Sequence, residues 1–133
     1  MEIIIVIVLV GILAGFGLRS YINAIQKTRE REMASNLKAM YAANSLYRAQ
    51  VRQYLSGVNS NLAFINTNLG LSIIGAGIIY TYNGAAGAYT IRADWRNTAN
   101  NNLVSIIINE QPLANNNPCC LAGLNGCLVI NAC

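Results

Sequence analysis

The chain begins with eighteen mostly apolar residues, MEIIIVIVLVGILAGFGL, in which Glu2 carries the one charge. As a helix, Ile3 to Leu18 would be about 24 Å long, slightly shorter than the roughly 30 Å of a bilayer core. A carboxylate buried in hydrocarbon costs several kcal/mol, so such a group usually has a partner and a role. The run predicts a transmembrane helix, and Glu2 is a candidate functional residue unless the helix end simply tolerates its charge.

Composition favours a membrane-associated or tightly assembled protein, because 54% of the 133 residues are apolar and only 11% are charged. A chain of this length has room for one modest domain. A cleaved secretory signal is the main alternative for the apolar run, but it lacks a cationic start and an A-x-A cleavage site. The helical pattern instead continues beyond Leu18.

Good helix formers fill the stretch from Arg19 to Leu55, and the first proline is Pro112. We therefore predict one long helix, apolar in its first half and amphipathic in its second, that ends at Ser56 and Gly57. Spacings of three and four residues mark one buried stripe on the second half, which another element must cover. The stripe consists of Met33, Leu37, Met40, Ala43, Tyr47, Val51 and Tyr54.

The formal net charge of +4 belongs to this helix, because residues 19–52 carry seven basic and two acidic side chains. A basic patch can bind nucleic acid or anionic lipid. Residues 29–32, however, read Arg-Glu-Arg-Glu, and this alternation is typical of a solvated face with salt bridges. We expect such a face and no specific nucleic-acid partner.

After Gly57 the composition shifts to Asn, Gly, Ala and β-branched residues, which is typical of short strands and turns. In the second predicted strand, alternate residues from Tyr89 to Trp95 share an apolar face that can cover the helix stripe. The predicted strands are Ile78–Tyr82, Ala88–Trp95, Leu103–Ile108 and Cys127–Ile130, with an antiparallel turn at Asn83–Gly87.

The four cysteines, Cys119, Cys120, Cys127 and Cys133, lie within the last fifteen residues. An even, clustered set favours disulfides over zinc, because the spacing lacks a C-x-x-C half-site and the chain has no histidine. A bridge between the vicinal pair would be strained, so two pairings with Cys127 and Cys133 stay open. Disulfides indicate that this end of the chain lies outside the cytosol.

The predicted fold class is therefore α+β, with a long N-terminal α-helix packed on a small antiparallel β-sheet and a C-terminal disulfide region. Residues 1–18 would be the hydrophobic transmembrane helix, and residues 19–56 its amphipathic continuation. Residues 57–133 would form a globular head that contains the sheet and the cysteines.

We do not expect an enzyme, because the chain has no histidine and its five acidic residues show no carboxylate pair. No serine has a plausible base, and no glycine-rich phosphate loop follows a strand. Asp94 and Glu110 could contribute to a calcium site, but two acids so far apart are weak evidence, and structural roles are favoured for both. No cofactor and no metal are expected.

Glu2, the apolar run after it, and Tyr21 followed by INAIQKTRE are similar to the start of type IV pilins. The resemblance covers about the first thirty-five residues and is specific among single-span segments. Members of that family have a long N-terminal helix packed on an antiparallel sheet, often closed near the C terminus by a disulfide loop. The residue pattern alone predicts the same architecture.

The resemblance implies a partner for Glu2, because in the family this glutamate is thought to neutralise the N-terminal amine of a neighbouring subunit during filament assembly. There the mature chain begins with a methylated hydrophobic residue and the glutamate stands fifth, so we expect three mature residues and a basic, cleaved leader before Met1. Such a leader would reconcile the positive charge after the apolar run with an exported C terminus. The implied partners are prepilin peptidase and the inner-membrane assembly machinery, and then copies of this chain in a helical, extracellular cell-surface filament.

One departure from the family is Arg19, where pilins usually have a proline that accompanies local melting of the helix in filaments. Gly11, Gly15 and Gly17 lie in the same stretch, and each weakens a helix by about 1 kcal/mol relative to alanine. Melting between Gly11 and Arg19 is one expectation. Close packing of helices through small residues, with Gly11, Ala14, Gly15 and Leu18 on one side, is the other.

The leading functional hypothesis is a major pilin, the structural subunit of a filament whose core is formed by the hydrophobic helices. A pseudopilin of a type II secretion or DNA-uptake apparatus is the close alternative, which the cysteines disfavour because major pseudopilins tend to rely on calcium. A monomeric membrane-anchored binding module, with Tyr80, Tyr82 and Trp95 exposed on its sheet, is the alternative from another class.

Overall fold

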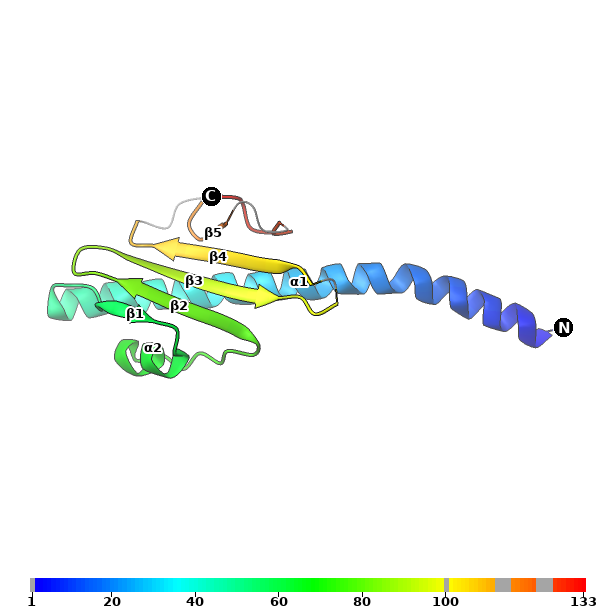
Figure 1. The fold of residues 1–133 in the computed structure, drawn as a ribbon, viewed down its shortest axis with the longest axis horizontal. Coiled ribbons are helices and arrows are strands. Elements are labelled where there is room, and N and C mark those ends of the chain that lie inside the picture. Colours follow the sequence, from blue (N-terminus) through cyan, green and yellow to red (C-terminus); the bar gives the residue numbers. More distant parts are fainter. Residues whose placement is uncertain (1, 100, 112–115, 122–125) are drawn as a thin grey trace.

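A single long helix determines the shape of the computed structural model, which describes residues 2–99, 101–111, 116–121 and 126–133. Helix α1 spans Glu2–Val51, and at 50 residues it is roughly 75 Å long. Its first half projects away from the rest of the chain, and its second half lies along a sheet (Figure 1). Because no proline interrupts this stretch, the backbone hydrogen bonds of the helix run without a break.

The remaining described residues form a five-stranded sheet and one short helix. Every neighbouring pair of strands is antiparallel, and the strand order follows the sequence order. The predicted α+β class, with a long helix on a small antiparallel sheet and C-terminal disulfides, is therefore confirmed. The elements are β1 (Gly57–Asn59), α2 (Leu62–Leu69), β2 (Ile78–Gly84), β3 (Tyr89–Arg96), β4 (Leu103–Asn109) and β5 (Cys119–Cys120).

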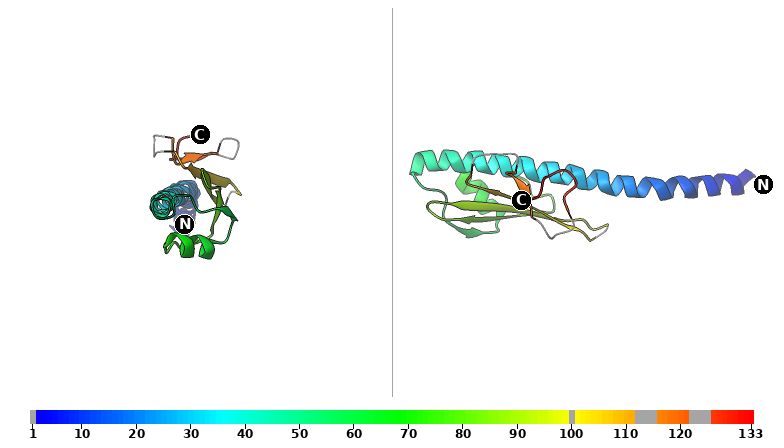
Figure 2. Two further views of the ribbon diagram at one scale, coloured as in Figure 1. Left: turned by 90° about the vertical axis from the view of Figure 1, so that its left-hand side faces the viewer. Right: turned by 90° about the horizontal axis from the view of Figure 1, so that it is seen from above.

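The second half of α1 and the sheet form two layers, and the hydrophobic core lies between them (Figure 2). Met33, Leu37 and Met40 of α1 are fully buried against the sheet. Alternate residues of β3 from Tyr89 to Trp95 face the same core, as their period-two pattern predicted. Helix α2 packs beside α1 and β2.

Helix α1 ends earlier than predicted, at Val51 rather than at Ser56. Arg52 adopts a left-handed backbone conformation (φ 62°), which stops the helix and turns the chain back toward the sheet. Tyr54, which is buried, therefore lies in the turn after α1 and not in the helix itself. Val51, which was assigned to the buried stripe, is exposed, so that assignment was wrong.

The strand predicted at Cys127–Ile130 is also wrong, because Cys127 has no regular structure and residues 128–130 are bends. The backbone N–H groups of Leu128 and Val129 donate to a side chain of α1 instead of to a neighbouring strand. The strand beside β4 is β5, which pairs with Ile106 and Ile107.

Three elements, β1, α2 and β5, were not predicted. The end signals of α2 are nevertheless present in the sequence. The side chain of Asn61 accepts the N–H of Ala63 at 2.9 Å, and Gly70 closes the helix in a left-handed conformation (φ 63°). The eight residues between them are too few for a helical period to stand out.

Candidate functional site

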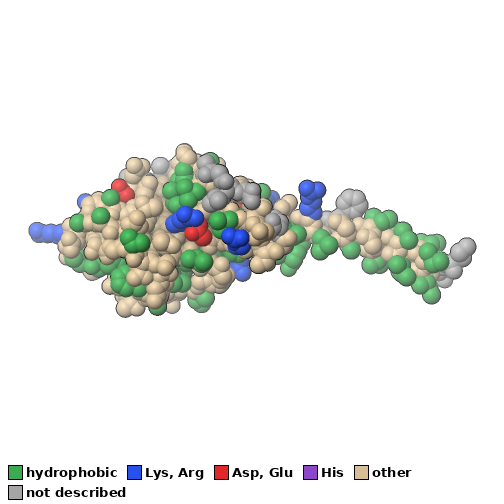
Figure 3. Space-filling view, in the orientation of Figure 1, with side chains coloured by type: hydrophobic (Ala, Val, Ile, Leu, Met, Phe, Trp, Pro, Cys, Tyr) green, Lys and Arg blue, Asp and Glu red, His purple; other side chains and the backbone are tan. Residues whose placement is uncertain are grey.

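The first half of α1 presents an apolar surface that the rest of the described chain leaves uncovered. We call residues 3–18 the apolar arm. Its large side chains from Ile3 to Leu13, and that of Leu18, are 53–75% exposed. In Figure 3 the arm carries a band of apolar side chains that extends well beyond the rest of the molecule. Among the described residues, α1 is the one helix long and apolar enough to cross a membrane.

Glu2 is the first residue of α1, at the start of the apolar arm. Its side chain lies outside the described part of the structure, so its role in assembly stays a prediction. The helix continues through Gly11, Gly15 and Gly17, and a β-carbon added to Gly11 or Gly15 would meet no atom within 4 Å apart from its chain neighbours and the adjacent helix backbone. The single chain therefore has no steric need for glycine at those two positions. Melting and close packing concern an assembled state, and both stay predictions.

A buried carboxylate lies where the second half of α1 meets the C-terminal region. Glu30 has no exposed surface. Its two oxygens accept the backbone N–H of Leu128 at 2.8 and 2.9 Å, and Oε2 accepts that of Val129 at 2.7 Å. Nε2 of Gln26 donates to Oε1 of Glu30 at 2.9 Å and to the carbonyl oxygen of Gly126 at 3.1 Å. The carboxylate and the amide thus bind the backbone of residues 126–129.

The expectation of a solvated charged face at residues 29–32 is wrong for Glu30. Arg29 and Glu32 do form a partly exposed pair at 2.7 Å. Glu30 instead precedes the buried Met33 by three residues and follows the buried Gln26 by four. This helical spacing extends the apolar stripe toward the N terminus, and it is the sequence signal that could have identified Glu30 as buried.

Both disulfides hold the segment that α1 binds. Cys119 pairs with Cys133, and Cys120 pairs with Cys127, which selects one of the two pairings left open by the sequence. The N–H of Cys120 donates to the carbonyl oxygen of Asn131 at 2.7 Å, and the N–H of Cys133 donates to that of Cys120 at 2.9 Å. Residues 126–133 are therefore attached to β5 on one side and to α1 on the other.

Hydrogen bonds from the half-buried Asn36 and the buried Asn44 to two buried tyrosines join the second half of α1 to the sheet. Nδ2 of Asn36 donates to the hydroxyl of Tyr80 at 2.8 Å, and Nδ2 of Asn44 donates to that of Tyr82 at 2.9 Å. The Tyr82 hydroxyl in turn donates to the carbonyl oxygen of Leu55 at 2.7 Å. Because burial disfavours the charged phenolate, it raises the pKa of Tyr82 to about 12 and also raises the pKa of Tyr80.

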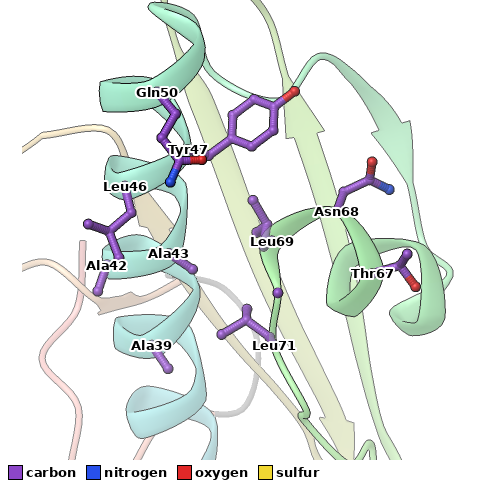
Figure 4. Close-up of a pocket in the computed structure, with 11 residues that line it drawn as sticks. Ala39, Ala42, Ala43, Leu46, Tyr47, Gln50, Thr67, Asn68, Leu69 and Leu71 are labelled. Atoms are coloured by element: carbon purple, nitrogen blue, oxygen red, sulfur yellow. The ribbon is translucent and has the colours of Figure 1, made fainter.

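The aromatic binding surface considered from the sequence does not form, because Tyr80, Tyr82 and Trp95 are buried. A groove of about 670 Å³ lies instead between α1 and the end of α2 (Figure 4). None of the described residues that line it is charged, so it offers mainly apolar contact. They are Ala39, Ala42, Ala43, Leu46, Tyr47, Gln50, Thr67, Asn68, Leu69, Gly70 and Leu71.

The described residues do not gather three His, Cys, Asp or Glu side chains into a group that could hold a metal ion. Asp94, which was considered for calcium, accepts a hydrogen bond from Nε of Arg92 at 2.8 Å. The arrangement that the structure describes is suited to contacts between surfaces: an apolar arm, a helix fixed to a sheet, and a cross-linked C-terminal segment.

Comparison of the chain with known protein families, with curated proteins and with solved structures gave no match. The architecture itself, a long N-terminal apolar helix packed on an antiparallel sheet, is consistent with a pilin-like fold.

Proposed function

We propose that this protein is a major pilin, the structural subunit of an extracellular helical filament. The observation that carries the proposal is the uncovered apolar arm, which continues without a break into a helix fixed to a sheet. Before assembly the arm lies in the inner membrane. In the filament the arms of many copies form the core and the folded heads form the outer wall. Contacts that do not close on themselves then generate an open helix of subunits.

The size of the apolar arm argues against a subunit that keeps this surface in water. Among the described residues of the arm, eleven large apolar side chains are exposed. Burying one such side chain contributes about 1.5–3 kcal/mol, so exposing all of them costs on the order of 15 kcal/mol or more. That equals or exceeds the typical stability of a folded domain, about 5–15 kcal/mol. Transfer from bilayer to filament core avoids this cost, because helix contacts replace lipid contacts.

Glu2 is the residue that we propose directs assembly. A carboxylate in an apolar core must be paired or protonated. The partner implied by the pilin resemblance is the N-terminal amine of a neighbouring copy. Prepilin peptidase and the inner-membrane assembly machinery would act on the subunit before it enters the filament. The proposal includes no catalysed reaction and no cofactor.

The variant Glu2→Ala tests this role. We expect it to insert into the membrane normally but to lower the filament yield more than about tenfold. The N-terminal amine of the neighbouring copy would lose its partner, and a buried charge without a partner costs about 3–5 kcal/mol. Electron microscopy and immunoblotting of sheared cell-surface material measure the yield, and the membrane fraction measures insertion. Glu32→Ala is the matched control, because it removes a carboxylate of α1 outside the arm and should leave the yield unchanged.

Three outcomes would contradict the proposal at different levels. A wild-type filament yield from Glu2→Ala would remove Glu2 from the assembly mechanism. Sheared material in which the wild-type chain forms no filaments would overturn the pilin function itself. Short filaments confined to the cell envelope would indicate a pseudopilin instead.

A further inference from the structure

The backbone of residues 126–129 is bound by two polar side chains of α1. The carboxylate of Glu30 accepts the N–H groups of Leu128 and Val129, and the amide of Gln26 donates to the carbonyl oxygen of Gly126. We call these contacts the Glu30 clamp. They join parts of the chain that are 98 to 100 positions apart in sequence. The disulfides hold the same segment from the opposite side, at β5.

We propose that the Glu30 clamp and the two disulfides form a redox-sensitive latch. Each set of contacts holds the other in place, and reduction of the disulfides releases residues 126–133 from α1. The latch concerns the single chain, so its test does not depend on whether the protein forms filaments.

The charge of Glu30 gives the clamp its strength. Among the described residues, Glu30 has no cationic partner, and its carboxylate is balanced by N–H groups alone. Hydrogen bonds to a charged group are stronger than neutral ones, and a buried carboxylate that loses them must be rehydrated. Water must therefore enter between α1 and the segment when the clamp opens.

The clamp and the disulfides are needed together because the other contacts of residues 126–133 are few: Cys127 and Ile130 pack partly buried against the core, and two backbone hydrogen bonds join the segment to β5. The side chains of Leu128 and Val129 are 46% and 40% exposed, so burial of apolar surface contributes little at the point of contact. Each ordered residue loses conformational entropy, and a few backbone hydrogen bonds do not compensate for eight such residues. Cys127 directly precedes the two clamped N–H groups, so its cross-link to Cys120 positions them under Glu30.

Reduction by a small dithiol opens the latch through ordinary thiol–disulfide exchange. One dithiol molecule reduces each protein disulfide: its thiolate attacks one sulfur and displaces the other cysteine as a thiolate, which leaves a mixed disulfide. The second thiolate of the same dithiol then attacks the mixed disulfide and displaces the remaining cysteine thiolate. Each protein disulfide gains two electrons and two protons to become two cysteine thiols, and the dithiol becomes a cyclic disulfide. The latch is thus open where thiols are kept reduced and closed in an oxidising compartment.

The coupling is measured on the full chain in detergent micelles with dithiothreitol as the reductant. We expect Glu30→Gln, which replaces one acceptor oxygen by an N–H donor, to speed release of the cysteine thiols about tenfold. Glu32→Gln is the matched control, because it changes a carboxylate two positions away that does not contact the segment, and its rate should equal that of the wild type. A rate for Glu30→Gln within about twofold of the wild type would overturn the latch.

The wild-type chain provides a second test that needs no substitution, because reduction of the disulfides should itself open the Glu30 clamp. After reduction, the amides of Leu128 and Val129 should exchange with deuterium more than about tenfold faster, while residues 33–40 of α1 stay protected. Unchanged protection of those two amides after reduction would overturn the proposal, even if Glu30→Gln failed to fold.

Discussion

At the scale of single residues, polar side chains on the buried face of α1 select one arrangement of the head. Gln26 and Glu30 bind the C-terminal segment, and Asn36 and Asn44 bind tyrosines of β2. Apolar contacts between a helix and a sheet tolerate small shifts in register, whereas a hydrogen bond between two buried groups does not. These contacts therefore position the sheet along and around α1.

The buried tyrosines predict a loss of stability at high pH. Burial raises the pKa values of Tyr80, Tyr82 and Tyr89, that of Tyr82 to about 12, above the value of 10.0 for an unfolded chain. The native state thus retains the phenolic proton longer, so its stability is complete below pH 10 and falls as the pH rises toward 12. Denaturation midpoints and tyrosinate absorbance, followed over this range, should change together.

Two substitutions distinguish the effect of the buried hydroxyls on stability from the general effect of alkaline pH. Tyr82→Phe should reduce the pH dependence of stability above pH 10, because it removes one of the groups responsible. Tyr21→Phe, at a position that is 64% exposed, should leave the dependence as it is. A stability that stays constant from pH 10 to 12 would contradict the account.

At the scale of elements, periodicity predicted the long helix and three strands because each buries one regular face. It missed the features that a single local contact determines. The end of α1 depends on the left-handed conformation of Arg52, and residues 128–130 bend where the N–H groups of Leu128 and Val129 donate to Glu30. The contact of Glu30 with residues 128 and 129 joins distant parts of the chain, so no pattern among neighbouring residues can reveal it.

The candidate site was likewise predictable from the sequence only in part. The apolar arm is itself a run of sequence, so hydropathy was sufficient to find it. The count and spacing of cysteines indicated disulfides but left two pairings, and the fold selected Cys119–Cys133 and Cys120–Cys127. The Glu30 clamp was not predicted, because the charge alternation of residues 29–32 indicates a solvated face and outweighs the helical spacing of Glu30 from Met33.

Gly84, at the end of β2, provides a test of packing at the scale of one element. A β-carbon there would overlap the carbonyl oxygen of Leu55 and the ring of Tyr82, in the place where those two groups form their hydrogen bond. We expect Gly84→Ala to lower the free energy of unfolding by about 1–3 kcal/mol. Chemical denaturation of the full chain in detergent measures the change.

Gly87, in the same hairpin, is the matched control for that substitution. A β-carbon at Gly87 would meet no atom within 4 Å. Gly87→Ala should therefore change stability by less than about 0.5 kcal/mol. Equal effects of the two substitutions would show that the contact between β2 and the turn after α1 is not as tight as described.

At the scale of the whole molecule, α1 serves two separate purposes along its length. Its first half is uncovered, and its second half is the helical layer of the head (Figure 1). The described contacts of the head involve the second half of the helix. The membrane affinity of the arm and the stability of the head should therefore respond independently to substitution.

Two substitutions test that independence. Leu37→Ala, in the core between α1 and the sheet, should destabilise the head by about 2–5 kcal/mol and leave membrane insertion unchanged. Val8→Arg, in the arm, should disfavour insertion by about 2.5–3.5 kcal/mol and leave the head intact. Flotation with vesicles measures insertion, and protease resistance measures the head. Release of the Leu37→Ala chain from vesicles would contradict the separation.

The unbroken course of α1 also has a mechanical consequence. A pull on the head is transmitted along one helix axis, and the stretch from Gly11 to Gly17 is where that helix is intrinsically weakest. A residue that unwinds from helix to extended chain lengthens from about 1.5 to about 3.3 Å, so these seven residues would extend by about 13 Å. We therefore expect this stretch to extend under tension before the cross-linked head unfolds.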